Sequence, residues 1–172
     1  MASLSGGLSQ DQYAAIGKVA NEWSFIDALL RHSIALVSKI DMELSAKMTA
    51  SLMSNQLYDL YLAILHDGKD GPQSALYKHI SAARKRFDEL RDKRNKVVHL
   101  DLTSDWMDDA VAVRNRARGK WSSTVERYST AEMETLAVEI KGLADALWQH
   151  VSDWSADRLE PPPLRTASAP RN

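Results

Sequence analysis

The fold is decided by residues 9–37, which read SQDQYAAIGKVANEWSFIDALLRHSIALV. Ser9 and Gln12 match a capping box, in which two side chains satisfy backbone N–H groups left free at a helix start. Apolar residues then recur at spacings of three and four, the period of one helix face. They are Ile16, Val19, Trp23, Ile26, Leu30, Ile34 and Val37. The stretch therefore predicts a long amphipathic helix that ends near residue 39.

Three further stretches carry the same helical period. Residues 42–66 predict a second helix, in which Leu44 and Met48 share one row and the apolar phase slips within residues 49–55. That slip favours a kink or a break. Residues 73–99 predict a third helix after a turn containing glycine and proline. A second capping box opens a fourth helix, at about residues 130–154.

The segment between the third and fourth helices breaks this pattern. Residues 111–114 and 123–128 have strand character and flank a glycine, so a small β-hairpin is expected around residues 110–128. The predicted fold class is therefore all-α, a bundle of four to five helices with this insert.

The predicted domain boundaries lie where the helical pattern begins and ends. Residues 1–8 are expected to form a flexible N-terminus, and residues 9–155 a single helical domain. Residues 156–172 contain a run of three prolines, which favours an extended or disordered tail.

Composition excludes several kinds of site. The 172 residues contain no cysteine, which rules out disulfides, cysteine-based zinc sites and thiol nucleophiles. The 5 histidines show no paired spacing typical of metal ligands, so we expect neither a metal nor another cofactor. No apolar run approaches the ~20 residues of a membrane helix, and no signal peptide is visible. A cytoplasmic protein without a membrane partner is expected.

Positive charge is concentrated in one part of the chain. The net charge is −1, but residues 78–120 carry 12 lysines and arginines against 7 aspartates and glutamates. This local basicity suits an anionic partner. A solvated helix face with many charges explains it equally well.

Residues 91–99, RDKRNKVVH, carry the most chemical information. At 100° per residue, Arg94 falls in the middle of the apolar stripe, where an arginine needs a partner or a function. Asn95 and His99 are four residues apart and share one flank of the helix. Arginine binds phosphate oxygens, and histidine transfers protons near neutral pH. The trio therefore suits cleavage of RNA through its own 2′-hydroxyl, which needs no metal. Alternatively, Arg94 forms a buried pair with Asp27, which also lies on an inward stripe.

The pattern Arg94-Asn95-x3-His99 near the end of a long helix resembles the signature of the HEPN family. The order of elements is also similar over roughly residues 10–155. The resemblance implies a metal-independent ribonuclease that acts as a homodimer, with two copies of the motif facing one cleft. It also implies a role as a toxin paired with a nucleotidyltransferase antitoxin, or a role in defence or RNA processing. One toxin subgroup has a modified tyrosine two residues after the histidine. This chain departs from it, with Asp101 there.

Three hypotheses follow. In the first, a dimeric ribonuclease uses His99 as general acid or base, Arg94 to stabilise the phosphorane, and Asn95 to orient or donate. Basic residues that would hold the RNA backbone are Arg84, Arg91, Lys93, Lys96, Arg114, Arg116 and Arg118. In the second, the chain is a non-catalytic regulatory module that binds a nucleotide or a protein. In the third, the domain is purely structural and Arg94 pairs with Asp27.

A second apolar row on the first helix bears on the expected dimer. Its members are Phe25, Leu29, Leu36 and Ile40. A helix that is apolar on two sides usually meets two partners. A deeper core, or contact with the last helix, explains the row equally well.

Overall fold

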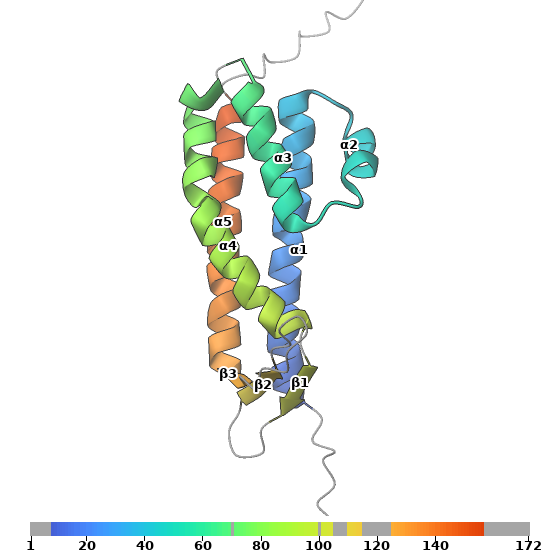
Figure 1. The fold of residues 1–172 in the computed structure, drawn as a ribbon, viewed down its shortest axis with the longest axis vertical. Coiled ribbons are helices and arrows are strands. Elements are labelled where there is room, and N and C mark those ends of the chain that lie inside the picture. The colour runs from blue at the N-terminus through green and yellow to red at the C-terminus, as the bar shows by residue number, and fades with distance from the viewer. Residues whose placement is uncertain (1–7, 70, 100, 105–109, 115–124, 157–172) are drawn as a thin grey trace, which may run out of the picture.

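The computed structural model describes residues 8–69, 71–99, 101–104, 110–114 and 125–156. Within these ranges five α-helices pack as a bundle, with a small sheet at one end (Figure 1). The helices are α1 (Gln10–Ser38), α2 (Met42–Thr49), α3 (Ser54–Asp67), α4 (Ala75–His99) and α5 (Thr130–Ala156). A 3-10 turn, η1 (Gly71–Gln73), precedes α4. The strands are β1 (Asp101–Ser104), β2 (Ala110–Arg114) and β3 (Val125–Ser129).

Both predicted capping boxes are present. At the start of α1, the Gln12 amide N–H donates to the Ser9 hydroxyl over 3.2 Å, and Ser9 N–H donates to the Gln12 side chain over 2.8 Å. At the start of α5, Glu132 N–H donates to the Ser129 hydroxyl over 3.2 Å, and Ser129 N–H returns a 2.8 Å bond to the Glu132 carboxylate. These local bonds fix where the two longest helices begin.

The predicted phase slip in residues 42–66 is a break that separates α2 from α3. Arg31 of α1 closes the break, because its guanidinium donates to the carbonyl of Thr49 and, over 3.3 Å, to that of Leu52. The Met53 N–H that begins α3 donates to the Gln56 side chain over 2.9 Å. One arginine therefore holds both sides of the turn against α1.

Helix α2 is oriented with its polar side inward. Ser45 and Thr49 are 1% and 2% exposed, whereas Leu44 and Met48 are 50% and 64% exposed. Figure 1 shows α2 beside the main bundle, joined to α1 and α3 by loops. The row that Leu44 and Met48 share thus faces outward, because α2 is held to α1 by polar bonds: Arg31 accepts from the Ser45 hydroxyl and donates to the Thr49 carbonyl.

The core lies between α1, α3, α4 and α5. The Phe87 ring of α4 contacts Trp23 of α1 at 5.2 Å and Tyr58 of α3 at 4.4 Å between ring centroids. The predicted inward stripes of α1, α4 and α5 supply most of the buried residues. Leu29, from the second apolar row of α1, is also buried in this core, whereas Phe25 remains half-exposed. For Leu29 the deeper-core explanation is therefore correct.

The small sheet lies where α4 ends and α5 begins (Figure 1). β2 and β3 pair antiparallel, with Ala110 opposite Ser129, where the sequence predicted a hairpin. β1 adds a third antiparallel strand that the sequence did not predict. The predicted hairpin turn, the N-terminus and the tail from residue 157 lie outside the described residues. Among the described helices, none is long and apolar enough to cross a membrane.

Replacing Arg31 with methionine should release α2. Loss of the two carbonyl bonds should reduce the free energy of unfolding by about 1–2 kcal/mol. Amide hydrogen exchange should accelerate in residues 45–53, while amides of the Phe87 core keep their protection. The control is Lys47→Met, which removes an exposed ion pair with Glu43 and should change stability little. Equal exchange in the two variants would contradict the role of Arg31.

Candidate functional site

The motif occupies the last two turns of α4. Leu90 and Val97 are buried on either side of Arg94, which is half-buried, as its place in the apolar stripe predicted. The Arg94 Nη1 donates to the side-chain oxygen of Asn95 over 3.0 Å. Burial lowers the pKa of Arg94, and the carboxylate of Asp27 opposes that shift. The guanidinium is therefore partly desolvated and has an anionic neighbour on α1.

Asp27 is the other half-buried charge of this region. Burial raises the pKa of Asp27, against a hydrogen bond from Ser54 and the positive charges of Arg31 and Arg94. The Ser54 hydroxyl also accepts a 2.9 Å bond from the Trp23 indole N–H. Among the described residues, Asp27 Oδ1 is buried and has no hydrogen-bond partner. Desolvation therefore outweighs the attraction of two nearby arginines.

His99 is the last residue of α4, and its side chain lies outside the described residues. At 100° per residue, the backbone positions of Arg94 and His99 differ by about 140° around the helix, whereas Asn95 and His99 differ by about 40°. Asn95, which bonds Arg94, therefore lies on the helix face of His99. Arg94 and His99 therefore occupy different faces of α4.

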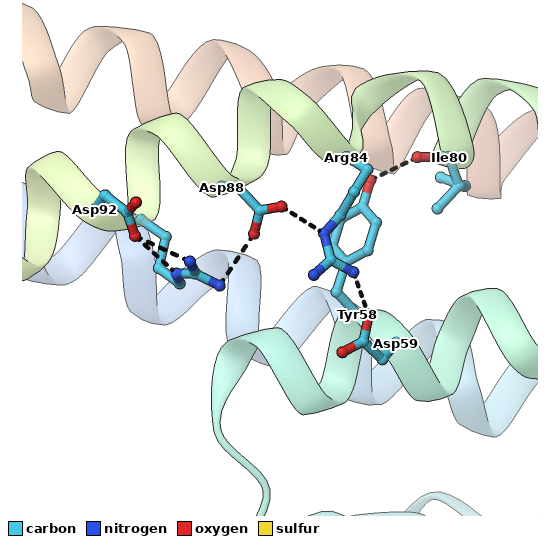
Figure 2. A network of polar contacts seen from close by, with 7 residues as sticks. Tyr58, Asp59, Ile80, Arg84, Asp88 and Asp92 are labelled. Carbon is cyan, nitrogen blue, oxygen red and sulfur yellow. Dashed lines mark hydrogen bonds and ion pairs between the residues drawn. The ribbon is translucent and has the colours of Figure 1, made fainter.

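Two of the predicted RNA-binding arginines are part of a row of alternating charges. Figure 2 shows the Arg84 side chain between Asp59 of α3 and Asp88 of its own helix, with the Asp88 oxygen 2.7 Å from Arg84 Nε. Arg91 continues the row: its Nη1 lies 3.0 Å from Asp88 Oδ1, and its Nη2 lies 2.9 Å from Asp92 Oδ1. The two guanidinium groups share three carboxylates, so the row carries no net positive charge.

Tyr58 supports Arg84 from the core side. The guanidinium carbon lies 5.4 Å from the centre of the Tyr58 ring, and the Tyr58 hydroxyl donates to the Ile80 carbonyl over 2.7 Å (Figure 2). Burial raises the pKa of Tyr58. Stacking on a fixed ring and pairing with two carboxylates restrict Arg84 to one position.

The other predicted RNA-binding residues differ in their surroundings. Lys93 lies 3.7 Å from Glu139 of α5, and Lys96 is half-buried. The side chain of Arg114, and all of Arg116 and Arg118, lie outside the described residues. Sequence spacing can indicate an ion-pair partner four residues away on the same helix, such as Asp88 for Arg84. It cannot indicate Asp59 as a partner of Arg84 or Glu139 as a neighbour of Lys93, because these carboxylates belong to other helices. The sequence pattern likewise did not predict that Ser54 and Arg31 lie near Asp27.

A hollow of about 510 Å³ lies between α1 and α5, away from the motif residues. Its lining carries both signs of charge, which does not favour a polyanion. Half-exposed Phe25 is at this hollow, so a dimer contact there stays a prediction. The lining residues are Asn21, Glu22, Ser24, Phe25, Lys141 and Asp145. In the described part of the chain, no group of three or more histidines and carboxylates is placed to hold a metal ion.

Comparison with known proteins gives no relative: no family model matches this chain, and neither does any curated protein or solved structure.

The Asp27–Arg94 pair makes a specific prediction about stability. Arg94→Met should reduce the free energy of unfolding by roughly 1–2 kcal/mol, because it leaves a desolvated carboxylate with less compensation. Adding Asp27→Leu should restore most of that loss. Combining Arg94→Met with Asp145→Leu should be additive, because the exposed Asp145 carboxylate pairs with Lys141 of its own helix and not with Arg94. Failure of the Asp27 rescue in urea unfolding would refute the pair.

The protonation of Asp27 predicts how the stability of the protein depends on pH, which is a second test of the same pair. A carboxyl group with a raised pKa favours the folded state below its ordinary pKa of about 4, and this contribution is lost as pH rises through the folded pKa. Relative to wild type, Asp27→Asn should therefore be more stable at neutral pH than at pH ~3. The opposite trend would mean that Arg31 and Arg94 outweigh desolvation.

Arg84→Met should weaken the contact between α3 and α4. The change leaves Asp59 and Asp88 without their shared cation and should cost about 1–2 kcal/mol of unfolding free energy at low salt. The cost should shrink in high salt, since part of it is electrostatic. Lys85→Met, one residue along, is the control, because its exposed pair with Glu89 spans 4.0 Å and should contribute little.

Proposed function

We propose that this chain is a metal-independent endoribonuclease of the HEPN type that acts as a homodimer. Arg94 would stabilise the negative charge of the phosphorane, and His99 would act as general acid or base. Asn95 would orient His99 or donate to a phosphate oxygen. The 2′-hydroxyl loses its proton and attacks the phosphorus, and the bond to the 5′ oxygen breaks as that oxygen takes up a proton; His99 would carry out one of these two transfers and water the other. Biological roles that fit are those of a toxin, a defence factor or an RNA-processing enzyme.

The observation that carries this proposal is the position of Arg94. The half-buried Arg94 guanidinium is partly desolvated and bonded to Asn95, which lies one turn before His99, the last residue of the same helix. Charge interactions are stronger where water is partly excluded, so such an arginine binds a phosphate better than an exposed one. Asp27 competes with the phosphate for Arg94. Substrate binding would therefore have to weaken that pair.

A second candidate function is a non-catalytic module that binds a nucleotide or a protein partner. The charge row favours it, because Arg84, Arg91 and Lys93 have carboxylate neighbours and offer less attraction to a long RNA backbone. A single nucleotide needs fewer cations than an RNA strand. Arg94 and Asn95 would then bind its phosphate without cleavage.

If the chain is instead a ribonuclease toxin, as in the first proposal, its proposed protein partner is a nucleotidyltransferase antitoxin.

The decisive experiment measures cleavage of varied RNAs in excess chelator. Wild type should cleave, and His99→Ala and Arg94→Ala should each be slower by about 10²–10⁴-fold. The control is His66→Ala, since His66 lies on α3 beside Asp67 and should leave the rate unchanged. Equal cleavage by wild type and His99→Ala would contradict the proposal.

The same preparations separate the two candidates. Absence of cleavage by wild type, together with thermal stabilisation by a nucleotide that Arg94→Ala abolishes, would favour the binding module. Absence of both would remove the ribonuclease and the nucleotide-binding module, and would leave the protein-binding module and the structural role of the Asp27–Arg94 pair.

A further inference from the structure

Two histidines from different helices stack on each other. His79 of α4 and His150 of α5 have ring centroids 4.1 Å apart and ring planes 29° apart. Figure 1 shows the first half of α4, in green, alongside the last half of α5, in red. The stack therefore joins the two helices far from the motif, at the end of the bundle opposite the sheet. No sequence spacing indicates it, because a long stretch of chain separates the two residues.

The surroundings of His150 disfavour its charged form. Burial and the neighbouring His79 lower the pKa of His150, and Asp153, one turn further along α5, opposes them. Asp153 is itself engaged, because it accepts a 2.7 Å hydrogen bond from the Gln149 side chain. From α4 the titratable group facing His150 is His79, and from α5 it is Asp153. A carboxylate that is already bonded offers limited compensation for a second positive charge.

Two other histidines contact groups other than a second imidazole. His66 lies 2.9 Å from the Asp67 carboxylate and contacts the Tyr77 ring at 5.8 Å. His32 contacts the Trp148 ring at 5.9 Å. A carboxylate or an aromatic ring near an imidazolium stabilises its charge. In the His79–His150 stack, each ring faces another imidazole, so two protons there would repel each other at close range.

We propose that the His79–His150 stack is an acid-sensitive contact between α4 and α5, closed at neutral pH and opened when both rings are protonated. One proton is tolerated, because an imidazolium stacks on a neutral ring. The second proton places two positive charges within one contact. A folded state that resists protonating His150 loses stability as pH falls below the ordinary histidine pKa of about 6.5. Acid would therefore loosen the first turns of α4 and the last turns of α5. This inference does not depend on the proposed ribonuclease activity.

The test compares melting temperatures across pH in wild type, His79→Gln and the control His66→Gln. Near pH 7.5 the loss of ring stacking should make His79→Gln equal to or less stable than wild type. Near pH 5 the order should reverse, with His79→Gln melting about 2–4 °C higher, because it carries one charge fewer in the contact. His66→Gln should show no such reversal. Parallel curves for wild type and His79→Gln would overturn the proposal.

A second measurement follows the titration of His150 by NMR. Its pKa should lie below the ordinary value in wild type, rise in His79→Gln and stay unchanged in His66→Gln. A wild-type pKa at or above about 6.5, or one that His79→Gln does not raise, would overturn the proposal even if both variants fold normally.

Discussion

The contact of Phe87 with Trp23 and Tyr58 is the interaction on which the rest of the structure depends. It joins α4 to α1 and α3 through three large rings with little or no exposure. Once Phe87 is fixed, the rotation of α4 is fixed as well. Arg84 then lies over Tyr58, and Arg94, two turns after Phe87, faces α1 near Asp27. A change in the packing of these rings would move both polar regions together, because they share one rigid helix.

Helix α4 has many cations, yet most of its positive charge is compensated nearby. Arg84, Arg91 and Lys93 have carboxylate neighbours on α3, α4 or α5. Arg94 and Asp27 differ because burial shifts the pKa of each side chain more than the opposite charge of its partner shifts it back. The candidate site is therefore defined less by the amount of charge than by its partial removal from water.

The two ends of α4 have different chemistry. The end near the sheet carries the Arg94 motif, and the opposite end carries the stack with His150 of α5. The aromatic core lies between them and separates the two regions. Proton uptake at one end need not disturb the other, since local openings involve only a few turns of helix. Helix α2, held by Arg31 and hydroxyl groups, is a third region with its own local stability.

The sequence by itself determined the features that depend on near neighbours. Ser9 with Gln12 and Ser129 with Glu132 set two helix starts, because the bonding partners are three residues apart. The period of apolar residues determined the inward stripes, including the half-buried position of Arg94, since helix geometry converts spacing into direction.

Only the tertiary structure decided which charges meet. Four features depend on contacts between distant segments of the chain. They are the pairing of α4 with Asp59 and Glu139, the outward apolar face of α2, the addition of strand β1, and the stack of His79 on His150. No local period encodes these contacts. They follow from the way the apolar stripes of four helices pack around Phe87, which places particular polar residues side by side.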